Sequence, residues 1–198
     1  MKRNLKGING VIVHVPETYE TTITAPGGTK FYVNNTIDDM TYVVRHGEVV
    51  TSSDPRIKPG DIAYFHHNMV KRRSVEYVDG KVGSSNELFD DMFIIPVEFV
   101  YLVKRGEDHL AIDPWCYVSP VPNDKFKEGS FEIANADKYK KQHGIMVYSN
   151  DSLREQGVND GTPVVFNLDS EYEFKIDDRV LYRMKTPWII GELRDERR

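Results

Sequence analysis

The chain has 198 residues, of which 39% are hydrophobic and 29% are charged, so the composition is that of a foldable protein and not of a disordered one. The formal net charge of −5 argues against nucleic acid as the main partner, because phosphate binding needs a positive surface. There is no apolar run of membrane-spanning length and no apolar core after the basic N-terminus to make a secretory signal, so a membrane is not an expected partner and the cytoplasm is the expected location.

Strand signals dominate the chain from end to end. Short segments rich in β-branched and aromatic residues alternate with clusters of Gly, Pro, Asn and Asp, which is typical of all-β sandwiches and barrels. In the first half the predicted strands are residues 11–15, 42–44, 48–50, 62–65, 74–78 and 99–103. In the second half they are residues 116–121, 145–148, 164–166, 172–176, 180–184 and 188–193. The sequence therefore predicts an all-β fold.

Turn and helix signals are fewer. Asp79-Gly80, between two apolar runs, is a strong signal for a two-residue hairpin turn, and Asp177-Asp178 is a weaker one. Residues 150–156, followed by Gly157, are predicted to form one helical turn with a glycine stop. Residues 138–142 are a second candidate for a helical turn.

The chain also repeats itself. Around Gly47 it reads G-E-V-V and then I-K-P-G-D-I-A-Y-F, and around Gly144 it reads G-I-M-V and then V-N-D-G-T-P-V-V-F. A period of roughly a hundred residues indicates two related domains and not a solenoid of short units. We expect these domains at residues 1–104 and 112–198, with a linker over 105–113. The predicted equivalent positions are Pro16 and Pro122, Gly47 and Gly144, Gly60 and Gly161, and Phe99 and Trp188.

In both copies the longest connection follows the first strand, over about residues 17–41 and 123–141. Connections of this length in a small domain are usually functional or disordered. The first contains Gly27-Gly28 followed by Phe31-Tyr32-Val33, and the second contains Phe131-Glu132-Ile133. A glycine-bearing hinge beside an apolar triplet favours a recognition loop. The alternative is that each triplet packs onto its own barrel.

The ordered set of V-I-V, a long glycine-containing loop, G-E-V-V, I-K-P-G-D-I and an apolar final strand, met twice, resembles the GroES-like co-chaperonin family in its tandem form. The resemblance covers most of the chain and implies two irregular β-barrels that assemble into homo-oligomeric rings. Such a ring caps a GroEL-like chaperonin cylinder and assists protein folding. The tandem arrangement is similar to that of the double-domain co-chaperonins of chloroplasts, and duplicated forms of this kind would also suit a bacterial or a bacteriophage genome.

The family docks a mobile loop, through an apolar triplet, on the chaperonin's apical domains. By position, the resemblance implies that Gly27, Gly28, Phe31, Tyr32 and Val33 are the partner-binding residues of the first copy. Phe131 and Ile133 are those of the second. The chain departs from the family's small aliphatic triplet, because copy one carries two aromatic residues and copy two carries Glu132 in the middle. A charge there weakens binding to an apolar groove unless it points to solvent.

No catalytic, metal-binding or cofactor-binding constellation is found in the sequence, so we expect no enzyme activity. His66 and His67 are adjacent at a strand, so their side chains are expected on opposite faces and a shared metal is not expected. Cys116, the single cysteine, is expected to be a buried structural thiol. The alternative function is a structural or assembly protein, for example a phage virion or accessory protein, that uses the GroES-like fold without docking.

Overall fold

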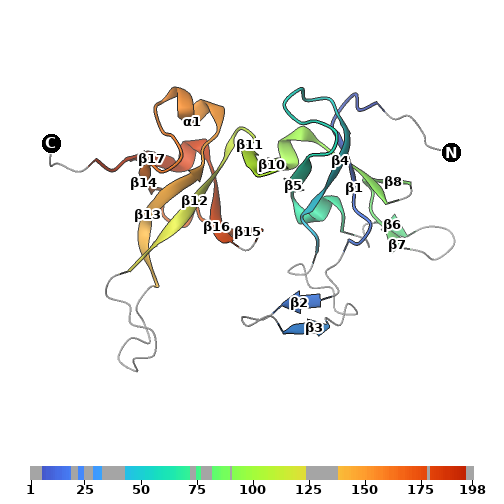
Figure 1. Cartoon of the computed structure of the whole chain (residues 1–198), viewed down its shortest axis with the longest axis horizontal. Coiled ribbons are helices and arrows are strands. Elements are labelled where there is room, and N and C mark those ends of the chain that lie inside the picture. The colour runs from blue at the N-terminus through green and yellow to red at the C-terminus, as the bar shows by residue number, and fades with distance from the viewer. Residues whose placement is uncertain are drawn as a thin grey trace. The chain divides into compact units, whose positions relative to one another are not determined.

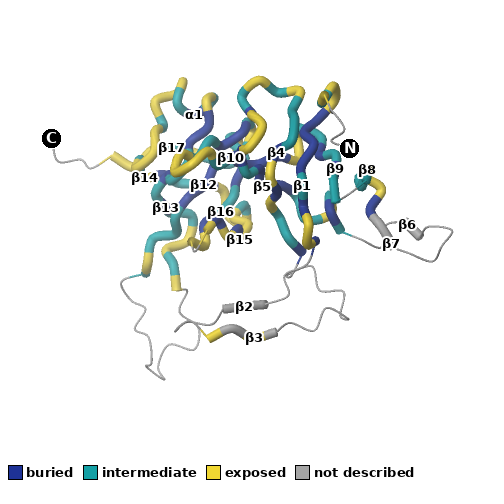
Figure 2. Tube along the Cα trace, turned by 45° about the vertical axis from the view of Figure 1, so that its right-hand side comes forward, coloured by how far each residue is buried: buried dark blue, intermediate teal, exposed yellow. Residues whose placement is uncertain are grey.

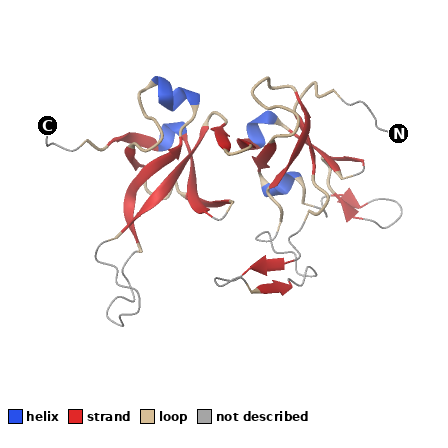
Figure 3. Ribbon diagram, viewed as in Figure 1, coloured by secondary structure: helices blue, strands red, loops and turns tan. Residues whose placement is uncertain are grey.

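The computed structural model describes residues 6–18, 22–24, 29–32, 43–71, 75–76, 82–89, 91–123, 138–177 and 179–194. The chain divides into two compact units, Met1–Asp108 and His109–Arg198. Strands make up most of the described residues, and the few helices are single turns (Figure 3). The all-β prediction is therefore confirmed.

The first sheet has seven strands in the order β11-β10-β5-β4-β1-β9-β8, and all of them lie in unit 1 except β11, which spans the boundary between the units (Figure 1). Two further hairpins lie outside this sheet, β2 (Thr22–Thr24) with β3 (Lys30–Tyr32) and β6 (Val75–Glu76) with β7 (Val82–Gly83). Two 3-10 turns, η2 (His67–Met69) and η3 (Val97–Phe99), connect strands of unit 1. The strands of the large sheet are β1 (Val11–His14), β4 (His46–Ser52), β5 (Ile62–Phe65), β8 (Glu87–Phe89), β9 (Met92–Ile95), β10 (Val100–Arg105) and β11 (Asp108–Ala111).

Unit 2 is built on a six-stranded sheet with the order β15-β16-β12-β13-β14-β17. The helix α1 (Asp151–Glu155) follows β13, and the 3-10 turn η5 (Thr186–Trp188) precedes β17. The strands are β12 (Trp115–Pro122), β13 (Tyr139–Tyr148), β14 (Pro163–Phe166), β15 (Tyr172–Ile176), β16 (Arg179–Lys185) and β17 (Ile189–Glu192).

The two sheets have the same strand order. Read from one edge, β10-β5-β4-β1-β9-β8 of unit 1 corresponds to β17-β14-β13-β12-β16-β15 of unit 2. The register agrees as well, because Ile12 lies opposite Thr51 and Ile94, and Tyr117 lies opposite Tyr148 and Arg183. In each unit the pairing shifts directly after that residue. Within the described residues, neither strand order closes on itself.

One turn is repeated in detail. Lys58-Pro59-Gly60-Asp61 in unit 1 and Asn159-Asp160-Gly161-Thr162 in unit 2 each place glycine third, with φ of 86° and 88°. This positive φ is what a type II turn requires at that position. In each turn the fourth side chain accepts a hydrogen bond from the first N–H, at 2.7 Å to Asp61 Oδ2 and 3.1 Å to Thr162 Oγ1. The predicted equivalence of the two motifs is confirmed at the level of the backbone.

Gly47 and Gly144 are also equivalent, and both are places of close approach. A Cβ atom on Gly47 would lie 3.0 Å from the carbonyl oxygen of His14 and 2.7 Å from Val15 Cγ2. One on Gly144 would lie 2.9 Å from the carbonyl oxygen of Ser119 and would overlap Val118 Cγ1. Both glycines are buried and lie opposite the first strand of their unit, so neither position has room for a side chain.

The core follows the central strands, as the dark segments of the tube show (Figure 2). In unit 1 the large buried side chains include Phe65, Phe93, Ile95 and Leu102. In unit 2, Cys116, Val118, Met146, Leu153, Val164, Phe166 and Met184 form one cluster. Burying a side chain of this size stabilises a fold by about 1.5–3 kcal/mol, so each unit has an apolar core of its own.

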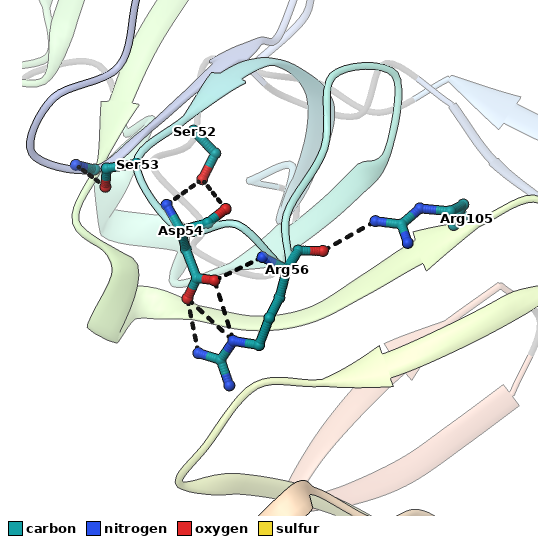
Figure 4. A network of polar contacts seen from close by, with 6 residues as sticks. Ser52, Ser53, Asp54, Arg56 and Arg105 are labelled. Carbon is teal, nitrogen blue, oxygen red and sulfur yellow. Dashed lines mark hydrogen bonds and ion pairs between the residues drawn. The ribbon is translucent and has the colours of Figure 1, made fainter.

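A polar network fixes the connection between β4 and β5 (Figure 4). Asp54 accepts hydrogen bonds from the Arg56 N–H at 2.9 Å and from its guanidinium at 2.7 Å, and the Ser52 hydroxyl accepts one from the Asp54 N–H at 3.0 Å. These contacts with Arg56 hold the pKa of Asp54 below its ordinary value, although burial opposes them. Arg105 donates to the Arg56 carbonyl oxygen at 2.9 Å, which ties the loop to the end of β10.

Several local predictions are wrong or need adjustment. Residues 138–142 are not helical, because from Tyr139 they belong to β13, where Tyr139 lies opposite Pro122. The segment expected as a linker contains β11, which pairs beside β10. Of the strand expected at residues 42–44, Val43 forms an isolated bridge and Tyr42 lies outside the described residues.

Both hairpin signals lie between paired strands. The stronger one, at Asp79-Gly80, lies between the paired strands β6 and β7, but residues 77–81 are outside the described residues. The weaker one, at Asp177-Asp178, lies between the paired residues Ile176 and Arg179; Asp177 has a φ of 51°, and Asp178 is outside the described residues. The helix expected at residues 150–156 is confirmed as α1, with Asn150 as its N-cap.

His66 and His67 do not point to opposite faces. Their rings stack with centroids 4.4 Å apart. Strand β5 ends at Phe65 and the chain turns into η2, so the alternation of a strand does not apply there. His66 Nδ1 accepts a hydrogen bond from the Asn68 N–H at 3.1 Å and caps this turn.

In the part of the chain that the structure describes, no helix has the length and apolar character needed to cross a membrane.

Candidate functional site

The two long connections after the first strands have a common base. In unit 1 the Val44 N–H donates to the Thr18 carbonyl oxygen at 3.0 Å, and in unit 2 the Asn123 N–H donates to the Lys138 carbonyl oxygen at 3.0 Å. Each bond joins the two ends of the connection. The two ends of each connection therefore lie next to each other, where β1 pairs with β4 in unit 1 and β12 pairs with β13 in unit 2.

The first connection contains the hairpin of β2 and β3. Ile23 lies opposite Phe31, and Thr22 lies opposite Tyr32. Phe31 is 53% exposed. A two-stranded hairpin is at best marginally stable alone in water. Phe31 is therefore an exposed aromatic side chain on a small β element, and not part of an irregular loop as the sequence suggested.

Of the seven predicted partner-binding residues, the structure places only Phe31 and Tyr32, which are neighbours on β3. Gly27, Gly28, Val33, Phe131 and Ile133 lie outside the described residues.

Unit 2 contains a second candidate site that the sequence reasoning missed. Five side chains, which we call the aromatic–cationic cluster, come from the neighbouring strands β12, β15 and β16 and from η5, which follows β16. The Arg183 guanidinium lies over the rings of Trp115 and Tyr172, 4.6 Å from each centroid. The Lys185 ammonium lies 5.1 Å from the ring of Trp115 and 5.7 Å from that of Trp188. The cluster is Trp115, Tyr172, Arg183, Lys185 and Trp188.

Strand pairing brings these residues together. Lys185 lies directly opposite Trp115, and Arg183 lies opposite Tyr172 on the other side of β16. A cation is attracted electrostatically to the face of an aromatic ring, by about 0.5–1 kcal/mol at exposed sites and more when water is excluded. The cluster therefore holds two cations in fixed positions at the surface of the sheet.

The cluster opens into a hollow of about 560 Å³, whose other walls come from the connection between β14 and β15, residues 167–171. A second hollow of about 370 Å³ is lined by Lys138, which precedes β13, and by Lys140 and Lys141 of β13. The two hollows share Leu168, Asp169 and Glu171. Together they form a surface with cations at both ends and a loop between them.

The same positions in unit 1 carry different chemistry. Register places Gly10 at the position of Trp115, Ile94 at that of Arg183, and Pro96 at that of Lys185. The cluster is therefore a property of unit 2 alone. One feature of the sequence could have pointed to the cluster: both tryptophans of the chain lie in its second copy, and the first copy has none.

Unit 1 has a charged group of its own that unit 2 lacks. Arg105 binds Asp61 through two hydrogen bonds, Nε to Oδ1 at 2.8 Å and a guanidinium NH2 to Oδ2 at 2.7 Å. The Asp61 side chain is only 3% exposed, and Arg105 is 46% exposed. Burial opposes ionisation of Asp61, but the bonds from Arg105 and the Lys58 N–H outweigh it and hold its pKa below the ordinary value. This group fixes the last turn before β5 to β10 and has a structural role.

Cys116 is buried in the unit 2 core, as expected from the sequence. Burial, with a smaller effect of Asp113, raises the pKa of its thiol to about 12. The thiolate needed for nucleophilic chemistry is thus scarce at neutral pH. Among the described residues, no group of three or more His, Cys, Asp or Glu side chains is placed to hold a metal ion.

Comparisons with protein-family models, with curated proteins and with solved structures find no match to this chain.

Proposed function

We propose that this protein is a tandem GroES-like co-chaperonin without enzyme activity, which assembles into a ring and caps a GroEL-like chaperonin through segments inserted after the first strand of each unit. The observation that carries the proposal is the repeated architecture. One strand order occurs twice, and in both copies the long insertion leaves and re-enters at a backbone hydrogen bond. In the first copy this insertion presents Phe31, exposed, on a short strand.

Each unit, on this proposal, is an irregular barrel of the GroES type. The described strands support it through their shared order and the repeated bulge in the first strand. Closure of each barrel stays a prediction, because the strand order is open at both edges within the described residues.

The energetics of docking are consistent with a reversible cap. Burying a phenylalanine side chain contributes about 1.5–3 kcal/mol, and one such segment gives a weak contact. A ring presents several copies at once, so the later contacts form intramolecularly and raise the overall affinity by about 10²–10⁴-fold. Weak single contacts and strong collective binding suit a partner that must be released.

A second candidate function is a structural assembly protein. The observation that favours it is the pairing of β3 with β2, which engages the Phe31 backbone in a small sheet. A docking segment of the family type is a loop before it binds. A segment already formed as a hairpin suits a permanent contact between subunits equally well.

The test is sedimentation of the purified chain with a bacterial chaperonin, with and without ATP. We expect ATP-dependent co-sedimentation, reduced at least about tenfold in Phe31→Ser, because loss of about 1.4 kcal/mol per contact is already tenfold and the contacts multiply. The matched control is Leu88→Ser. Leu88 is an exposed apolar residue on β8 of the same unit, outside the insertion.

Two results would count against docking. If the chain associates with no chaperonin under any nucleotide but assembles with itself, the structural function is the better one. If Leu88→Ser weakens association as much as Phe31→Ser, the insertion is not the contact.

A further inference from the structure

We propose that the hollow beside the aromatic–cationic cluster of unit 2 binds an extended peptide segment that carries a carboxylate next to an apolar side chain. This site is separate from the insertion after β1, and its far end lies beside the base of the insertion after β12.

Lys185 of the cluster is positioned for an anion. Lys185 is half-buried, and its ammonium lies over the rings of Trp115 and Trp188. Among the described residues, no carboxylate lies within ion-pairing distance of this ammonium. The ring faces thus fix the cation without neutralising its charge, and a carboxylate entering the hollow would complete the pair.

The walls of the hollow are suited to an apolar side chain. Trp115, Tyr172 and Trp188 line it together with Leu168, which is 57% exposed. Its volume of about 560 Å³ lies within the range of ligand-binding clefts. Asn167 and Ser170 on the same wall offer polar groups to a peptide backbone.

The shape favours an extended segment over a compact small molecule. The hollow meets the second one, of about 370 Å³, along Leu168, Asp169 and Glu171. A chain that lies across both would place further acidic groups near Lys140 and Lys141, which are exposed at the far end.

The charges favour a peptide over a nucleic acid strand. Asp169 and Glu171 lie where the two hollows meet, and would repel a continuous phosphate backbone that crosses this point. A peptide can place a neutral residue there and its carboxylates on either side. The net charge of −5 likewise disfavours nucleic acid.

The experiment uses the tryptophan fluorescence of the full chain, because both tryptophans, Trp115 and Trp188, line the hollow. The probe is an acetylated peptide of alternating phenylalanine and aspartate. The comparison peptide carries asparagine in place of aspartate, and a short oligothymidylate is the nucleic acid probe. We expect a saturable fluorescence change with the acidic peptide below about 1 mM, weakened by salt, and a much weaker response to the asparagine peptide.

The variants test whether the charge is responsible. Lys185→Met keeps the apolar stem and should weaken binding of the acidic peptide about tenfold, whereas Lys185→Arg should restore it. Lys175→Met is the matched control, because Lys175 is an exposed lysine on β15 that lines neither hollow. Near-UV circular dichroism of each variant checks that unit 2 remains folded.

Three results would overturn the proposal. The first is no response to the acidic peptide from a folded protein. The second is binding that Lys185→Met leaves unchanged. The third is a response to the oligothymidylate that exceeds the response to the peptide, which would assign the hollow to nucleic acid.

Discussion

Unit 1 and unit 2 use one strand order to carry different side-chain chemistry, and the turn before β5 and β14 shows how. In unit 1 the fourth turn residue is Asp61, which binds Arg105 at the end of β10. In unit 2 the equivalent residue is Thr162, and Arg194, at the position of Arg105, instead lies 3.0 Å from Glu192. The backbone of the turn is the same in both. The ion pair therefore belongs to unit 1 alone among these equivalent positions, and the conformation of the turn does not depend on it.

The surface of β16 shows the converse case, in which unit 2 carries charged side chains that unit 1 lacks at the equivalent positions. Arg183 and Lys185 of unit 2 replace Ile94 and Pro96 of unit 1, and Trp115 replaces Gly10. A strand order that occurs twice can carry different surface chemistry in each unit. Substitutions at matched positions can separate what belongs to the frame from what belongs to one unit.

The largest loss of stability is expected from adding a side chain at Gly144, where two backbone segments lie close together. Gly144→Ala should destabilise unit 2 by about 2–3 kcal/mol and lower its melting temperature by roughly 10 °C, because the new methyl group meets the Ser119 carbonyl oxygen and Val118. Tryptophan fluorescence follows this unfolding. Gly191→Ala is the control, since a Cβ there meets nothing within 4 Å. Equal loss in both variants would contradict the packing argument.

The next largest loss of stability is expected from removing the Asn150 side chain in the connection between β13 and β14. Asn150 is buried, accepts from the Leu153 N–H at 2.9 Å, and donates to the Trp115 carbonyl oxygen at 2.9 Å. Asn150→Ala should lower the free energy of unfolding of unit 2 by about 2 kcal/mol, because the helix loses its N-cap and the Trp115 carbonyl oxygen loses its donor. The equivalent Ser53 is exposed, and its hydroxyl accepts from the Gly10 N–H at 2.9 Å, so Ser53→Ala should cost less than about 1 kcal/mol. Denaturant titration of both variants gives the two values. A larger loss in Ser53→Ala than in Asn150→Ala would contradict this prediction.

A smaller effect is expected from the ion pair of unit 1. Asp61→Asn should cost about 1–2 kcal/mol at neutral pH, through loss of charge-assisted hydrogen bonds. The folded pKa of Asp61 is lowered, so its contribution is fully present above the ordinary aspartate pKa of about 4 and is lost as pH falls below it. Wild type and variant should therefore converge in acid, as measured by hydrogen exchange in β5 and β10. Glu192→Gln, in the exposed pair of unit 2, should change stability by less than about 0.5 kcal/mol at any pH.

The smallest effect is expected in the labelling of Cys116, which reports how often the core of unit 2 opens. With a thiol pKa of about 12, its thiolate is rare at pH 8, and burial blocks access. A thiol reagent should label the native chain only through opening of unit 2, and faster in Gly144→Ala. Rapid labelling of native protein would show that the core around Cys116 is open.

The sequence predicted the frame well because the frame depends on local rules. Alternating apolar residues located most strands, and Gly60 and Gly161 marked a turn that only glycine adopts without strain. The aligned glycines support the correspondence of the two copies, since a side chain has no room at Gly47 and Gly144, and the positive φ at Gly60 and Gly161 favours glycine. Asn150 with Gly157 located α1.

The surface could not be predicted in the same way. The aromatic–cationic cluster joins residues from the start of β12 and the far end of β16, and only the register places Trp115 opposite Lys185. The stacking of His66 on His67 depends on where β5 stops. The segment at residues 138–142 has helix-forming lysines and glutamine, but pairing in β13 overrides that preference.

The hydrogen bonds at the base of each insertion, from Val44 to Thr18 and from Asn123 to Lys138, also bear on how this protein can evolve. They make each insertion a cassette whose two ends already meet. Doubling the length of a closed loop costs only about 0.6 kcal/mol of chain entropy, so its content can be exchanged at little cost to the sheet beneath. Under the proposed function, the partner could then change by grafting, while both sheets fold as before.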